Sequence, residues 1–278
     1  MPSFDTPDPI SVTLEFDIGS VRITAAKRTD TVVEVRPADP GSEADVRIAE
    51  QTKVTCANGA LVLKAPKKRS IFGRAGSIDV TVEVPTGSEI RGDVPMGDFT
   101  LEGVFGDCRL KTSVGRIQVG EAATVHLRSD HGEVRLGRAG GDAEVQSSGR
   151  IEINGVEGAL TVKNLNGETV VGQVGGELRA NSSNGAITVG AALAGVDAKS
   201  AHGSIRIGEL VRGRTVLQTS IGDLEIGVRE GTAAWLDVHT KVGGVRTELE
   251  ASNAPGEAVE QLEVRARTQL GDIVIRRA

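Results

Sequence analysis

The chain has 278 residues, a formal net charge of −6, 36 glycines, one Trp, five Phe and no Tyr. This composition excludes nucleic-acid binding, because it supplies neither the basic footprint nor the aromatic stacking platforms that nucleic acids require. The first ten residues lack the basic and apolar segments of a secretory signal, and no apolar run is long enough to span a bilayer. We therefore expect a cytoplasmic protein without a transmembrane segment.

Residues 1–94 are predicted to form an N-terminal β-strand capping region. Short segments there alternate between apolar and polar residues, which is typical of strands with one buried face. Turns such as Asn58-Gly59 separate them, and the segment Phe16–Ile23 echoes one unit of the repeat that follows. A cap would cover a sheet edge that could otherwise pair with other chains. The predicted strands are Val12–Phe16, Val21–Thr24, Val32–Val35, Val46–Ile48, Leu61–Leu63 and Ile78–Val84.

Residues 95–278 repeat a unit in which a glycine precedes two alternating apolar residues, as in Gly185, Ile187 and Val189. The anchor glycines are Gly97, Gly115, Gly132, Gly149, Gly167, Gly185, Gly203, Gly222, Gly243 and Gly271, with spacings of 18, 17, 17, 18, 18, 18, 19, 21 and 28. A second glycine often follows five residues later, and we expect both glycines at corners. A second apolar pair, such as Val196 and Ala198, leads to the next anchor.

Each unit therefore contains two short strands and cannot bury its apolar face alone, so the units must stack. The predicted fold is all-β: a single-stranded β-solenoid with two short strands in each turn of about eighteen residues. The apolar pairs do not follow a hexapeptide period, and the glycine-aspartate repeat of calcium-binding rolls is missing. We expect no metal and no cofactor.

Stacking would align equivalent residues of successive turns about 4.8 Å apart. Directly after the anchor glycines, the charge alternates from turn to turn, and two residues further on Arg206, Glu225 and Arg246 follow one another. Such alternation favours cross-strand ion pairs on a solvated face. The alternating residues after the glycines are Asp98, Arg116, Glu133, Arg150 and Glu168.

The residues four positions before the anchors form a second series, which we name the basic row. Like charges stacked this closely repel, so the row requires compensation by nearby carboxylates or by an external anion. We interpret it either as a solvated face or as an interaction surface for an acidic polymer, a lipid head group or a protein partner. The row comprises Lys111, Arg128, Lys163, Asn181, Lys199, Gln218, His239 and Arg267.

Small polar residues stand one position after the basic row, among them Thr219, Thr240 and Thr268. We expect them to hydrogen-bond the turning backbone. Elsewhere, the basic segment Lys67-Lys68-Arg69 lies in a loop with Ile71 and Phe72 at its tip. This loop is predicted to be solvated or, alternatively, to dock on a partner or an anionic surface.

No catalytic, metal-binding or cofactor-binding residues can be nominated. The four histidines are far apart in the repeat, and no nucleophile motif accompanies them. Cys56 and Cys108 lack metal-ligand spacing; we interpret them as free thiols, with a disulfide as the alternative. Trp235 could fill the C-terminal turns or bind a sugar.

The strand Ile78–Val84 with Pro85 and Gly87-Ser88, followed by units such as Ser113–Val119 and Ser183–Val189, resembles the bacterial putative-adhesin family. The resemblance extends from about residue 10 to the end of the sequence. It implies a repeated β-strand fold and association with the cell envelope, and it brings no catalytic motif and no site residues.

We expect a non-enzymatic binding or scaffold protein that presents a long, rigid sheet surface to a protein or an acidic polymer. Its predicted interaction residues are Lys111, Arg128, Lys163, Lys199, Arg267, Lys67, Lys68 and Arg69. One alternative is a structural protein that assembles end to end or side by side through the solenoid ends, because the strand Leu270–Ile275 leaves little room for a cap. The other is a carbohydrate-active β-helix enzyme, which would need carboxylates in a cleft.

Overall fold

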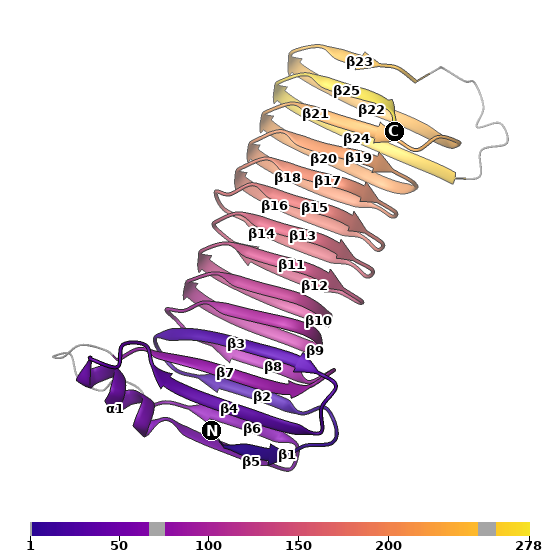
Figure 1. Cartoon of the computed structure of the whole chain (residues 1–278). Coiled ribbons are helices and arrows are strands. Elements are labelled where there is room, and N and C mark those ends of the chain that lie inside the picture. The colour runs from indigo at the N-terminus through magenta and orange to yellow at the C-terminus, as the bar shows by residue number, and fades with distance from the viewer. Residues whose placement is uncertain (1, 67–75, 250–259) are drawn as a thin grey trace. The chain divides into compact units, whose positions relative to one another are not determined.

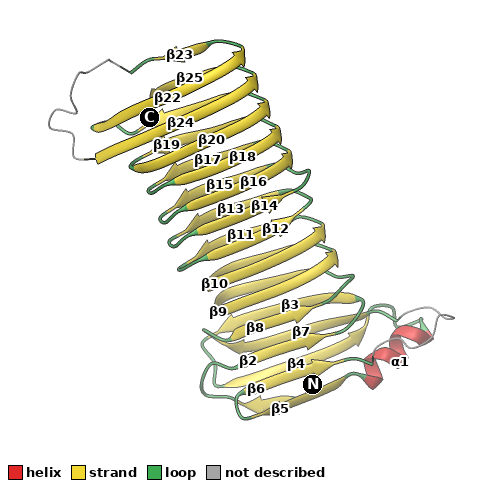
Figure 2. Cartoon of the chain, turned by 180° about the vertical axis from the view of Figure 1, so that it is seen from behind, coloured by secondary structure: helices red, strands yellow, loops and turns green. Residues whose placement is uncertain are grey.

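A computed structural model describes residues 2–66, 76–249 and 260–278. The chain is an all-β parallel β-solenoid, as predicted (Figures 1 and 2). It divides into two compact units, residues 1–138 and residues 139–278, and each unit is described by itself. The predicted division between residues 94 and 95 stays a prediction.

The second unit is a stack of two-strand turns. In one typical turn, β16 (Leu178–Asn184) pairs in parallel with β14 and β18, while β17 (Ile187–Ala192) pairs in parallel with β15 and β19. Alternate residues of each strand face inward and are buried, which gives the core its period of two. The other strands are β12 (Ala143–Ser147), β13 (Ile151–Val156), β14 (Leu160–Asn164), β15 (Thr169–Val174), β18 (Val196–His202), β19 (Ile205–Leu210), β20 (Gly213–Ile221), β21 (Leu224–Val228), β22 (Thr232–Val242), β23 (Val245–Thr247), β24 (Glu260–Leu270) and β25 (Ile273–Arg277).

The anchor glycines lie where neighbouring turns approach most closely. A Cβ added at Gly203, whose φ is +156°, would lie 2.2 Å from the carbonyl oxygen of Gly185, so only glycine fits there. The second glycines are not at corners, as we predicted, but inside strands. Gly190 lies within β17, where a Cβ would meet the Gly172 carbonyl oxygen at 2.4 Å. Close backbone approach, and not a corner, explains these glycines.

At the C-terminal end, the order of the turns differs from their order in the sequence. The strand β24 pairs with β20 on one side and with β22 on the other, and β25 lies likewise between β21 and β23 (Figure 1). The last turn, β24–β25, is therefore inserted, and the preceding turn, β22–β23, lies outermost. We name β22–β23 the edge turn. The strand Leu270–Ile275, which we expected to leave little room for a cap, therefore does not lie at the end of the stack.

The small polar residues at the corners confirm this order. Several of them hydrogen-bond the turning backbone, as predicted, and the acceptors are anchor carbonyls of the neighbouring turn: the Thr219 hydroxyl donates to Gly203 at 2.9 Å. The Thr268 hydroxyl donates to Gly222 at 3.0 Å, and the Thr240 hydroxyl donates to Gly271 at 2.8 Å. These hydrogen bonds satisfy backbone oxygens that would otherwise be buried without partners.

The first unit contains the same parallel turns and a similar insertion. The strand β2 (Ser11–Glu15) pairs in parallel with β6 and β8, and β3 (Gly19–Ala26) pairs in parallel with β7 and β9. The predicted likeness of Phe16–Ile23 to a repeat unit is therefore confirmed. The remaining parallel strands are β6 (Ala60–Lys64), β7 (Ile78–Pro85), β8 (Glu89–Asp93), β9 (Phe99–Val114), β10 (Ile117–His131) and β11 (Val134–Ala139).

Antiparallel strands and one helix continue this N-terminal end. The strand β5 (Lys53–Ala57) pairs with β6 across the predicted Asn58-Gly59 turn, β4 (Asp30–Pro37) pairs with β7, and β1 (Ser3–Asp5) pairs with β4. These antiparallel strands continue the stack beyond its outermost parallel turn, β6–β7, on both of its sides. As a result, the strands β6 and β7 each have neighbours on both sides.

The helix α1 (Glu43–Gln51) replaces the strand that we predicted at Val46–Ile48 (Figure 2). Ser42 caps the helix, since its hydroxyl accepts from the Asp45 N–H at 3.4 Å and donates to the Asp45 carboxylate at 3.1 Å. The same carboxylate accepts from the backbone N–H of Ser77 and of Asp39, each at 3.1 Å. These hydrogen bonds, that from Ser77 foremost, lower the pKa of Asp45. They join the start of the helix to the segment before β7.

Candidate functional site

The outer residues of one sheet form the predicted ion pairs between turns. Arg150 meets Glu168 at 3.0 Å, and in the first unit Arg116 meets Glu133 at 3.7 Å. Each pair is largely exposed and stabilises the fold by about 0–1 kcal/mol. These pairs favour the correct register between neighbouring turns. Because their charges are paired with one another, they do not form a binding site for a charged ligand.

Arg206 and Glu225 form a two-pronged contact of this kind, with two hydrogen bonds of 2.6 Å. Their hydrogen bonds raise the pKa of Arg206 and lower the pKa of Glu225. Arg246, which we expected to follow Glu225, lies instead beside Val274 of the inserted turn. The predicted three-charge series is therefore wrong at its last member.

The basic row is divided between the two units. In the first unit, Lys111 of β9 and Arg128 of β10 are register partners, so two cations lie on neighbouring strands. The Arg128 guanidinium reaches Asp130 at 2.9 Å. Lys111 is a register partner of Asp93 on its other side, which places a carboxylate-bearing residue beside it.

In the second unit, neutral residues separate most of the cations of the basic row. The register runs from Lys163 through Asn181 to Lys199, and then through Gln218 to Arg267 and His239. Lys163 reaches Glu144 at 3.7 Å, Lys199 reaches Asp197 at 3.2 Å, and Arg267 reaches Asp237 at 3.4 Å. The repulsion expected along the row is thus reduced by amide side chains and by flanking carboxylates.

One groove gathers the C-terminal members of this row. It has a volume of about 410 Å³ and lies along β18, β20, β24 and β22. Four of its ten lining residues are basic and none is acidic. The lining residues are Lys199, Ser200, Gln218, Thr219, Ser220, His239, Lys241, Arg267, Thr268 and Gln269. We name it the basic groove.

The hydroxyl groups of the basic groove are largely occupied by the fold. Ser200 donates to Gly185 at 3.3 Å, and Thr219 and Thr268 donate to anchor carbonyls as described above. The basic and amide side chains therefore remain as the groups that could meet a ligand, although Lys199 and Arg267 also contact Asp197 and Asp237. An arrangement of this kind can bind an anion by charge and hydrogen bonding.

The sequence prediction found Lys199 and Arg267 but missed Lys241. Lys241 stands two positions before Gly243, outside the basic row, and only the inserted last turn brings Arg267 between Gln218 and His239. Trp235, for which we weighed filling the C-terminal turns against binding a sugar, has 58% of its surface exposed on β22 and does not fill those turns. The loop residues Lys67, Lys68 and Arg69 lie outside the described residues.

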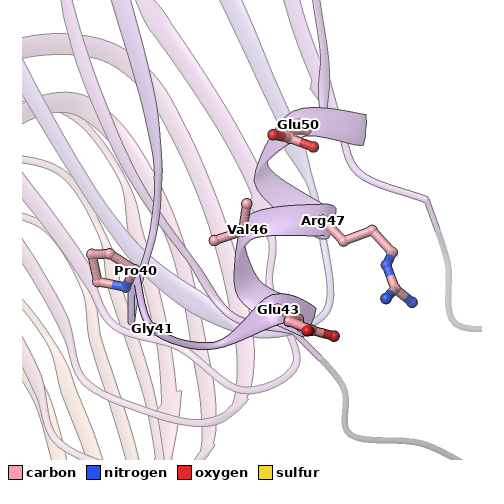
Figure 3. Close-up of a pocket in the computed structure, with 6 residues that line it drawn as sticks. All are labelled: Pro40, Gly41, Glu43, Val46, Arg47 and Glu50. Atoms are coloured by element: carbon pink, nitrogen blue, oxygen red, sulfur yellow. The ribbon is translucent and has the colours of Figure 1, made fainter.

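A second depression, of about 350 Å³, lies beside α1 (Figure 3). Val46 points toward Pro40 there, while the side chain of Arg47 extends away from Pro40 and Gly41. Its charged residues, Glu43, Arg47 and Glu50, come from one helix face and do not converge on a common point. We assign no chemistry to this depression.

Within residues 2–66, 76–249 and 260–278, no group of three His, Cys, Asp or Glu residues could hold a metal ion. Both cysteines are free thiols, so the disulfide alternative is wrong. Burial, with a smaller contribution from Asp107, raises the pKa of Cys108 to about 12. Across the same described ranges, no helix has the length and apolar character needed to cross a membrane.

No family model matches the chain, and no curated protein matches it. Solved structures that match are described as putative adhesins, the description carried by the family that the repeat resembles. The protein from Bacteroides fragilis NCTC 9343 is 14% identical, with 99% of this chain and 95% of that chain covered and a TM-score of 0.38.

Two further structures come from Parabacteroides species. That from Parabacteroides merdae ATCC 43184 is 9% identical, with 99% and 94% coverage and a TM-score of 0.40. That from Parabacteroides distasonis ATCC 8503 is 9% identical, with 98% and 95% coverage and a TM-score of 0.35. At these identities and TM-scores, the likenesses carry no inference about what this chain binds.

Proposed function

We propose that this protein is a non-enzymatic binding protein whose rigid sheet surface holds an extended acidic polymer in the basic groove. The observation that carries the proposal is the lining of the groove: four basic residues and no acidic one, in a chain whose net charge is −6. Because the net charge would repel a polyanion, binding must depend on this local concentration of cations.

The geometry favours an extended ligand over a compact one. The groove crosses four strands whose neighbours are about 4.8 Å apart, so its cations recur along a line. Lys199 and Arg267 would contribute at separate points along the ligand, with Gln218 between them. Asp197 and Asp237 flank the groove, and their negative charges would repel the acidic polymer and so confine it to the groove.

The same groove disfavours polysaccharide cleavage. Glycoside hydrolysis uses a pair of carboxyl groups that flank the scissile bond, and the lining of the groove contains none. Sugar recognition also draws on exposed aromatic rings, and Trp235 is not among the lining residues.

The test is binding of fluorescent polyglutamate to the full chain, measured by anisotropy at several salt concentrations. We expect binding that weakens as salt rises and that falls at least tenfold in Lys199→Glu with Arg267→Glu. The control is Arg22→Glu, which makes the same change of charge as Arg267→Glu but on the outer side of β3. Equal losses in Arg267→Glu and Arg22→Glu would show that net charge, and not the groove, governs binding.

A further inference from the structure

The edge turn has a strand edge without a described neighbour and a core that is incompletely buried. Among the described residues, β22 pairs only with β24, and β23 pairs only with β25. Leu236 and Val238 face inward on β22 but are only half-buried, whereas their register partners Val264 and Ala266 are fully buried. As far as the described residues go, the apolar interior of the second unit is therefore open at this end.

The exposed apolar surface continues around the edge turn. Val245 of β23 is exposed, although its register partner Ile273 is fully buried. At the adjacent corner, Ile221, Leu270 and Val242 occupy neighbouring turns in register, and all three are exposed. Trp235 adds its ring on the outer side of β22. Exposed aliphatic and aromatic side chains gathered around an open strand are typical of an interface.

The backbone of β22 is suitably oriented for a further strand. The carbonyl of Val242 accepts from Gly271 at 2.9 Å, which turns it toward the inserted strand β24. Because backbone groups alternate along a strand, the even-numbered residues of β22 face β24 and the odd-numbered residues face the open side. Asp237, His239 and Lys241 thus present their N–H and C=O groups to an incoming strand.

A second copy of β22 complements these residues. A two-fold axis pairs the strand with itself in antiparallel orientation. Centred on Val238, the axis places Asp237 opposite His239 of the other copy and Trp235 opposite Lys241. Centred on His239, it places Asp237 opposite Lys241. Both registers oppose a carboxylate and a basic side chain, whereas a register centred on Asp237 would oppose two carboxylates.

We propose that two copies of this chain associate through the edge turn, with β22 pairing antiparallel with β22 across a two-fold axis. The open inward side chains of Leu236 and Val238 then pack against the inward side chains of the other copy's β22. The proposal builds on the same groove as the proposed function, because His239 and Lys241 belong to both surfaces. Dimerisation would bring two basic grooves to either side of one junction.

Sedimentation of the full chain across a wide range of concentration tests the proposal. We expect twice the mass of one chain, with dissociation to the monomer only on dilution. The variant Trp235→Lys with Val238→Lys should remain monomeric at the concentrations where the parent is dimeric. Leu165→Lys is the matched control, since Leu165 is also an exposed apolar residue of the second unit, and it should leave the mass unchanged.

Cysteine cross-linking determines the register. In a Cys56→Ser background, Val238→Cys should form a disulfide between two chains under mild oxidation if the axis passes through Val238, and His239→Cys should do so if it passes through His239.

A mass of one chain at every concentration would overturn the proposal, and so would a dimer that survives Trp235→Lys with Val238→Lys in a chain whose thermal unfolding is intact. Lys199→Glu separates the two proposals: it should weaken polyglutamate binding and leave the dimer mass unchanged.

Discussion

At the N-terminal end of the first unit and at the C-terminal end of the second, the terminal turn of the chain lies second in its stack. The first turn, β2–β3, is inserted beside β6–β7, and the last turn, β24–β25, is inserted beside β22–β23. The two ends then differ. β6 and β7 are followed by the antiparallel strands β5 and β4, whereas the described residues add no strand beyond the edge turn.

This difference shows how the end of a stack of similar turns can be covered by another strand or left open to one. Leu61 and Leu63 of β6 are fully buried because β5 and its neighbours complete the surrounding structure, whereas Leu236 at the corresponding place in β22 is only partly buried. An extra antiparallel strand seals the edge without adding another turn. An unsealed edge retains both apolar surface and unpaired backbone groups, which are the requirements for association.

The largest expected effect is on the inserted turns themselves. Gly19→Ala and Gly271→Ala should each destabilise the protein by about 3 kcal/mol or abolish folding. An added Cβ would lie 1.8 Å from the Ile78 carbonyl oxygen in the first case and 2.1 Å from the Gly222 carbonyl oxygen in the second.

Chemical denaturation of these variants provides the measurement. Gly140→Ala is the control, because a Cβ there meets no atom within 4 Å, and we expect a change below about 1 kcal/mol. If all three variants lost equal stability, the close contact between turns would not be what fixes the inserted turns.

The next effect compares one side-chain change at the two ends. Leu63→Ala should cost about 3 kcal/mol, since it empties a fully buried site. Leu236→Ala should cost only about 1 kcal/mol in the monomer, because part of that side chain is already in contact with water. Equal losses in urea denaturation of the monomer would contradict the view that the edge turn is open.

A smaller effect depends on pH and concerns the sealed end. The lowered pKa of Asp45 means that the ionised carboxylate stabilises the folded state. This contribution is fully present above the ordinary carboxyl pKa and is lost as the pH falls through the lowered pKa of the folded state. Asp45→Ala should therefore lower the melting temperature more at neutral pH than in strong acid. Melting curves of both proteins over this pH range would reveal a constant difference if the carboxylate were unimportant.

The smallest effect lies between the ends. Removing the exposed pair Arg206 and Glu225, whose side chains are 54% and 35% exposed, should reveal a coupling free energy of about 0.5 kcal/mol. A double-mutant cycle at low and high salt would measure it, and the coupling should shrink as salt rises. A coupling as large as the loss in Leu63→Ala would mean that ion pairs, and not packing, distinguish the regions of the stack.

The sequence predicted the solenoid because its two strongest signals are local. Glycine marks close approaches between turns, as at Gly203, and alternation marks inward-facing strands, as in Ile187–Val189. Both patterns follow from the geometry of a single turn. Repetition along the chain therefore identified which residues form turns and which of them face the core.

The order of the turns could not be predicted in this way, because a periodic pattern assigns residues to turns without saying which turns are neighbours. The wider spacings before Gly243 and Gly271 were the signal that the final turns depart from simple succession. The basic groove depends on this order, which explains why Lys241 was missed. The helix α1 was missed for another reason: Ser42 and Asp45 form a helix-starting pair, whereas the short apolar segment Val46–Ile48 suited a strand equally well.

Insertion of β24–β25 also has a consequence for synthesis of the chain. As the ribosome extends the chain, β22–β23 is released before the strands that must lie between it and β20–β21. Until residues 260–277 follow, the nascent chain has either a gap in its stack or a temporary pairing of β22 with β20, which the last turn must displace. Completion of the second unit is therefore tied to translation of its final segment, and a chain stopped before Glu260 would expose adhesive strand edges to other nascent chains.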